Sequence, residues 1–187
     1  MSSSDLQNLS NMNETRRLIL KSAILAPLLP FSQLAGAALS GERKLSFYHT
    51  HTGEKLSVVY HDGSEYLADS LSDIDSCLRD FRTGDIQTID PLLLDQLFAL
   101  KRMTGSNGVY QVISGYRSPA TNSKLRNKSS GVAKKSLHMQ GRAIDVRLTG
   151  VDCANLRKAA VSLKTGGVGL YRKSNFVHLD TGRYRTW

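Results

Sequence analysis

Two histidines and one carboxylate carry the strongest chemical signal in this sequence. His138 and Asp145 lie seven positions apart across Gly141, and His178 follows far downstream. Imidazole nitrogens and a carboxylate oxygen can bind one divalent ion, and three protein ligands leave a coordination position for water, as in catalytic zinc sites. The pattern therefore predicts an open metal site with His138, Asp145 and His178 as candidate ligands.

The residues around these ligands predict strands that would position them. Three apolar residues alternate with Asp145 and Arg147 over residues 143–148. This alternation is typical of a half-buried strand, and it places Asp145 on the face away from the apolar residues. Asp180 follows His178 by two positions and therefore shares its strand face.

The remaining pattern predicts an α+β fold. We expect strands at residues 45–48, 56–60, 110–114, 143–148, 166–171 and 175–180, and helices at residues 67–81, 90–103, 120–127 and 152–164. The first two strands flank residues 51–54, which read as a hairpin turn. Because strands and helices do not alternate as βαβ units, the expected architecture is an antiparallel sheet with flanking helices.

The N-terminal segment is typical of an export signal. Residues 15–21 resemble the twin-arginine motif, a modest apolar run follows, and small residues offer a cleavage site near Ala37. We therefore expect a signal peptide at residues 1–37, a β-hairpin region at 38–66 and the main domain at 67–187, the last two forming one compact domain. Export by the twin-arginine (Tat) machinery would place a soluble mature protein in the periplasm.

The charge of the chain indicates which partners it could bind. The net charge is +9, and +8 remains after residue 37, because the leader holds three basic and two acidic residues. A basic exported protein suits an anionic polymer such as the carboxylate-rich cell wall. No basic stripe interleaved with aromatic residues indicates nucleic acid. We expect a monomer.

The two cysteines leave two alternatives open. Cys77 and Cys153 both occupy apolar helical positions. In an oxidising compartment they could form a disulfide, or they could remain as two buried thiols. Neither is a credible nucleophile.

Three motifs occur in one order along the chain. Residues 114–118 read Ser-Gly-Tyr-Arg-Ser, residues 136–145 contain Ser-x-His-x-x-Gly-x-Ala-x-Asp, and the histidine strand follows. Together they resemble the zinc D-alanyl-D-alanine peptidases of the Hedgehog and D,D-peptidase group, over about residues 113–187. The hairpin at 51–54 and the tail at 166–182 are most similar to the exported murein-endopeptidase branch. The resemblance implies that group's sheet-and-helix fold.

The resemblance also implies roles for individual residues. His138, Asp145 and His178 would ligate one Zn²⁺ ion per chain. Arg117 would face a substrate carbonyl or carboxylate, with a structural salt bridge at the turn as the alternative reading. Ser136 would support its loop or contact the substrate.

The general base is not assigned by the sequence. Many relatives carry Asp or Glu three positions before the last ligand, where this chain has Asn175. An amide can orient water but cannot accept its proton. Asp180 is the nearby acid, and it could act as the base or could orient His178.

These observations lead to one expected function and two alternatives. The resemblance implies a zinc metalloendopeptidase that hydrolyses peptide cross-links of peptidoglycan during cell-wall growth or remodelling, and carboxypeptidase activity also fits. A non-catalytic wall-binding module with a residual zinc site is the first alternative, suggested by Asn175. A non-haem iron oxygenase also uses two histidines and a carboxylate, but usually places the carboxylate two residues after the first histidine. Which cross-link is cut stays open at this point.

Overall fold

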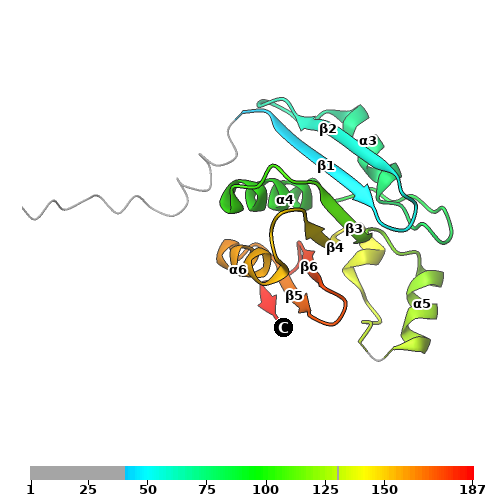
Figure 1. The fold of residues 1–187 in the computed structure, drawn as a ribbon. Coiled ribbons are helices and arrows are strands. Elements are labelled where there is room, and N and C mark those ends of the chain that lie inside the picture. Colours follow the sequence, from blue (N-terminus) through cyan, green and yellow to red (C-terminus); the bar gives the residue numbers. More distant parts are fainter. Residues whose placement is uncertain (1–40, 130) are drawn as a thin grey trace, which may run out of the picture. The chain divides into compact units, whose positions relative to one another are not determined.

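The computed structural model describes residues 41–129 and 131–187, which contain a seven-stranded sheet in the order β2-β1-β3-β4-β6-β5-β7 (Figure 1). The strands are β1 (Arg43–His49), β2 (Lys55–His61), β3 (Tyr110–Ser114), β4 (Ala143–Leu148), β5 (Gly167–Tyr171), β6 (Phe176–Asp180) and β7 (Arg185–Thr186). The helices are α3 (Ala68–Cys77), α4 (Pro91–Thr104), α5 (Pro119–Lys128), α6 (Cys153–Leu163) and the 3₁₀ turn η1 (Leu137–Gln140).

The sheet is mixed, so the expected antiparallel sheet is wrong, although the α+β class is right. β1 runs parallel to β3, and β5 runs parallel to β7, whereas the other neighbours are antiparallel. A tight turn can join only antiparallel strands, and parallel neighbours need a longer crossover. The chain passes through β2, α3 and α4 between β1 and β3, which supplies that crossover.

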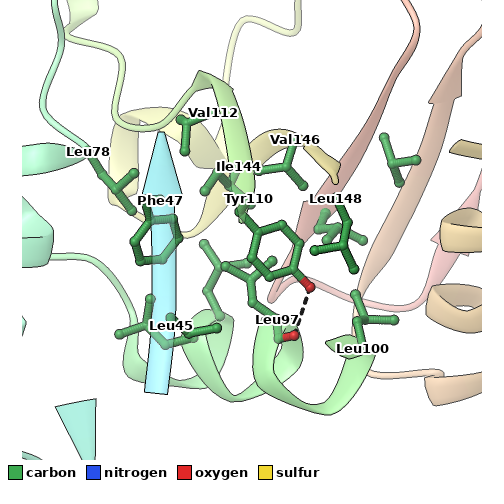
Figure 2. Close-up of a cluster of buried hydrophobic side chains, with 14 of the residues drawn as sticks. Leu45, Phe47, Leu78, Leu97, Leu100, Tyr110, Val112, Ile144, Val146 and Leu148 are labelled. Carbon is green, nitrogen blue, oxygen red and sulfur yellow. Dashed lines mark hydrogen bonds between the residues drawn. The ribbon is translucent and has the colours of Figure 1, made fainter. Parts of the chain in front are cut away.

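The hydrophobic core lies on the face of the sheet that α4 and α6 cover. α4 packs against β1 and α6, while α6 packs against β4, β5 and β6. Side chains from neighbouring strands meet those of α4 here, among them the fully buried Phe47, Tyr110 and Leu97 (Figure 2). The Tyr110 hydroxyl donates a hydrogen bond of 2.8 Å to the Leu97 carbonyl, so its polar atom is satisfied inside the core. Asp145 and His178 alternate with core residues of β4 and β6 and therefore face the opposite side of the sheet.

The helices begin and end near the predicted residues. In α4, the Asp90 carboxylate accepts the Leu92 N–H at 3.0 Å, Pro91 occupies the first turn, and Gly105 ends the helix with a φ of 63°. α3 is shorter than predicted and ends at Cys77. The segment after it is a loop that joins the candidate site.

The two cysteines are separate thiols in the structure. Cys77 and Cys153 are both buried, and neither forms a disulfide. Burial raises the pKa of Cys77 to about 11. Of the two alternatives left open by the sequence, the structure has the free thiols.

The predicted signal peptide lies outside the described residues and stays a prediction. Within residues 41–129 and 131–187, no helix combines the length and the apolar character needed to cross a bilayer.

Candidate metal centre

The three predicted ligands meet at one point on the face of the sheet opposite α4 and α6. His178 Nδ1 lies 2.9 Å from Asp145 Oδ1 and 3.3 Å from His138 Nε2. His138 Nε2 lies 3.4 Å from the same Asp145 oxygen. All three ligand atoms lie within 4.8 Å of one another, and all three residues are buried. One ion could therefore contact all three.

Strand register places two of these ligands side by side. Asp145 on β4 pairs directly with His178 on β6. The same row continues to Ser114 on β3 and to Gly169 on β5. Because alternate residues of a strand point to opposite faces, Asp145 and His178 lie away from the core. Ser114 joins them because the register of β3 shifts at a bulge between Val112 and Ser114. The alternation seen in the sequence thus determines on which face of the sheet Asp145 and His178 lie. The strand register determines how close their side chains are.

The third ligand is positioned by η1 and by a close backbone contact. His138 Nδ1 lies 2.8 Å from the Gly115 carbonyl, which leaves Nε2 to face the other ligands. Gly141 ends η1 with a φ of 66°, and a Cβ there would lie 2.0 Å from the Thr88 carbonyl oxygen. Only glycine suits this position, because both its backbone conformation and its surroundings exclude a side chain.

The protonation states of the three candidate ligands favour binding of a cation. Burial alone would raise the pKa of Asp145, but His138, His178 and Arg117 outweigh burial and hold the pKa well below its usual range. Burial lowers the pKa of His138, which favours the neutral, metal-binding form. Burial also acts to lower the pKa of His178, but Asp145 and Asp180 outweigh it and raise the pKa. The same two carboxylates would attract a metal ion.

The residues therefore fit zinc. Two imidazole nitrogens and one carboxylate oxygen are ligands that Zn²⁺ accepts, and three protein ligands leave a further position in a tetrahedral site. This fit rests on the donor set and its geometry.

Asp180 contacts His178 at Nε2, the ring nitrogen that does not face the other candidate ligands. Its Oδ2 accepts hydrogen bonds from His178 Nε2 at 3.0 Å and from Arg185 Nη2 at 2.6 Å. Its Oδ1 accepts the backbone N–H groups of Gly167 and Gly182, each at 2.9 Å. Burial would raise the pKa of Asp180, but these partners lower it well below its usual range. A fully engaged carboxylate of low basicity is suited to orienting an imidazole rather than to accepting a proton.

Arg117 contacts a candidate ligand directly. Its Nε donates to Ser114 Oγ at 2.8 Å, and its Nη2 donates to Asp145 Oδ2. Its backbone N–H donates to the His138 carbonyl at 3.2 Å. Arg117 thus supports the carboxylate of the candidate ligand Asp145, and its predicted contact with substrate stays a prediction.

The other two predicted residues differ in their placement. Ser136 is buried, precedes η1 and lines the cleft above the ligands. Asn175 is exposed at the turn before β6, has a φ of 50° and does not line this cleft. Its carbonyl accepts a hydrogen bond from Arg147 at 2.5 Å. The structure therefore brings Ser136 to the site, while the predicted role of Asn175 in orienting water receives no support from its position.

A cleft of about 660 Å³ opens above the ligands. Its walls include residues that sequence reasoning did not assign to the site, namely His51, Arg82, Lys135, Tyr171, Arg185 and Trp187. The Trp187 ring lies 5.2 Å from the His178 ring, centroid to centroid. Trp187 can approach because Gly169 has no side chain: a Cβ there would lie 2.4 Å from the Trp187 ring. The pairing of Gly169 with His178 explains this glycine, which the sequence alone could not.

Comparison with known proteins identifies the family. A family model described as peptidoglycan L,D-endopeptidase MepK matches residues 37–187. The chain is 44% identical over 165 residues to the peptidoglycan L,D-endopeptidase MepK of Escherichia coli strain K12, an alignment that covers 88% of this chain and 91% of that protein. It is 40% identical over 161 residues to the probable peptidoglycan L,D-endopeptidase MepK of Haemophilus influenzae, covering 86% and 87%. This chain therefore belongs to the MepK family of peptidoglycan L,D-endopeptidases, a branch of the zinc D-alanyl-D-alanine peptidases that its motifs resemble.

Proposed function

We propose that this protein is a zinc metalloendopeptidase that hydrolyses peptide cross-links of peptidoglycan, with His138, Asp145 and His178 as the zinc ligands. The observation that carries this proposal is the convergence of the three ligand atoms in the lining of one cleft. Membership of the family supplies the reaction class and the substrate class. Membership of a peptidase family argues against the alternative of a non-haem iron oxygenase.

The names of the relatives favour one type of cross-link. They are called L,D-endopeptidases, and the diaminopimelate-to-diaminopimelate link joins an L centre to a D centre. The D-alanyl-to-diaminopimelate link joins two D centres. We therefore propose the diaminopimelate-to-diaminopimelate link as the bond that is cut.

The zinc ion and the residues around it would have different roles in the reaction. Bound zinc would supply a polarised substrate carbonyl and a water whose pKa is lowered to about 7. Asp180 orients His178 through the Nε2 hydrogen bond, so that Nδ1 faces the ion. Arg117 fixes Asp145 and lines the cleft, where its positive charge would stabilise negative charge developing on the carbonyl oxygen. Among the described residues that line the cleft, Asp145 and Asp180 are the only carboxylates.

The proposed setting is the periplasm. It rests on the twin-arginine motif and on the small residues near Ala37. The cationic chain would also be attracted to the anionic wall.

The direct test is digestion of purified sacculi by the zinc-loaded full chain, followed by mass spectrometry of the soluble muropeptides. We expect one zinc per chain, release of muropeptides cut at the diaminopimelate-to-diaminopimelate link, loss of release with EDTA, and no release by Asp145→Ala. Sacculi left uncut by the metal-loaded chain would refute the proposal.

The same experiment separates the second candidate. Asn175 stands where the resemblance to the zinc D-alanyl-D-alanine peptidases would lead one to expect an acid, so a wall-binding module with a residual zinc site is the competing function. That module would bind sacculi without producing new peptide ends, and Asp145→Ala would leave its binding unchanged.

A further inference from the structure

Arg82 is a cleft residue that the proposed chemistry does not use. It lies in the loop after α3 and lines the same cleft as the candidate ligands. Its guanidinium lies over the Phe81 ring, 4.0 Å from the ring centroid. The same ring stacks with His51, with centroids 4.2 Å apart and an interplanar angle of 12°. A cation placed over an aromatic face is held more firmly than a free side chain.

The backbone of Arg82 is tied to the candidate active site. Asp80 is buried, and its Oδ1 accepts the Arg82 N–H at 3.0 Å. Its Oδ2 accepts the Ser118 N–H at 2.8 Å, and Ser118 is the neighbour of Arg117. One carboxylate therefore fixes the loop of Arg82 against the turn of Arg117.

The Arg82 guanidinium forms no ion pair with any residue that the structure describes. Arg79, three positions earlier, is held by Glu54 at 3.0 Å. Within residues 41–129 and 131–187, no carboxylate oxygen lies within 4.0 Å of the Arg82 guanidinium. Burial and repulsion from Arg117 outweigh the attraction of Asp80, and they lower the pKa of Arg82 from its ordinary value. An accessible, positioned and unpaired guanidinium in a substrate cleft is complementary to a carboxylate.

We propose that Arg82, with Phe81 and His51 beside it, forms a subsite that binds a free carboxylate of diaminopimelate in the cross-linked peptide. This inference rests on the proposed function and deepens it, since it names a feature of the substrate that the cleft selects. In a diaminopimelate-to-diaminopimelate link, the carbon that carries the reacting nitrogen also carries a free carboxylate. Arginine binds such a group through two parallel hydrogen bonds, which fix its direction as well as its charge.

The test combines a change in the protein with a change in the substrate. The two ligands are a diaminopimelate-linked muropeptide dimer and the same dimer with its free diaminopimelate carboxylates converted to amides. The proteins are the full-length wild type, Arg82→Gln, Arg82→Lys and, as a matched control, Arg79→Gln from the same loop. Binding is measured by calorimetry on metal-free protein, so that cleavage does not interfere, and KM and kcat are measured on zinc-loaded protein.

We expect Arg82→Gln to weaken binding of the dimer about tenfold or more and to raise KM by a similar factor, with kcat changed less than threefold, because one charge-assisted contact is lost. Amidation should weaken wild-type binding by the same factor and should not weaken binding by Arg82→Gln any further. Arg82→Lys should lie between the two, and Arg79→Gln should match the wild type.

Three outcomes would overturn the subsite. The first is equal binding of the dimer by Arg82→Gln and wild type, and the second is no binding by either. The third is an equal loss of binding on amidation in both proteins, since Arg82 would then not be the partner of the carboxylate. If zinc-loaded wild type fails to cut the dimer, the proposed function fails separately, and the binding comparison still decides the subsite.

Discussion

Replacing Asp180 by Asn tests whether this buried carboxylate sets the metal affinity of His178. Asp180 is fully buried and accepts hydrogen bonds from His178, Arg185 and two backbone N–H groups. An amide oxygen can still accept the backbone N–H groups. The amide nitrogen would then face donors from His178 and Arg185, so those contacts would be lost.

The magnitude follows from the contacts that are lost. Without its acceptor, the His178 ring no longer favours the tautomer and orientation that direct Nδ1 to the ion. Losing such a partner costs about 10- to 100-fold in metal affinity, or about 1.4 to 2.8 kcal/mol. The lost hydrogen bonds to charged groups should also lower the free energy of unfolding by about 3 kcal/mol, discounting the contact of Arg185, whose side chain is 36% exposed.

The assay is a zinc titration against a competing chelator, accompanied by urea unfolding of metal-free protein. Asp152→Asn is the matched control: Asp152 caps α6 by accepting the Ala154 and Asn155 N–H groups at 2.9 Å, and asparagine is an equally good cap. We expect the control to bind zinc as the wild type does. A zinc Kd for Asp180→Asn within twofold of wild type would refute the reasoning.

Three further predictions concern the core and the loops. Gly169→Ala should displace the Trp187 ring at a cost of less than about 1 kcal/mol of stability, because this side chain is 47% exposed and can move outward. Since the chain has a single tryptophan, a red shift of its fluorescence reports the displacement directly, and an unchanged spectrum would contradict it. Cys77 and Cys153 should resist a thiol reagent at pH 8 in the folded protein and titrate as two thiols after denaturation, whereas a missing thiol would indicate a disulfide. Hydrogen bonds outweigh burial and lower the pKa of Asp80, so its stabilising effect should be complete above the unfolded-state pKa of about 3.9 and disappear as the pH falls further. The stability difference between wild type and Asp80→Asn should shrink over that range in urea titrations, and a difference independent of pH would count against this account.

Local patterns predicted much of the fold. Asp90 and Asp152 each cap a helix close to the expected position, since capping depends only on a few consecutive residues. The hairpin of β1 and β2 and the strands β3, β4 and β6 also formed where alternation indicated them. The direction of β3 relative to β1 was not predictable in this way, because it depends on the path of the chain through α3 and α4.

The sequence by itself determined the ligand types and the strand face on which Asp145 and His178 lie, because a strand's alternation is a local property. Only the tertiary structure decided that Asp145 pairs with His178, since register depends on contacts between distant segments. It alone also brought Arg185 and Trp187 to the site, because β7 has two residues and so carries no periodicity to detect. The placement of Arg82 in the cleft has the same physical origin: a loop residue is positioned by what its backbone binds elsewhere in the chain.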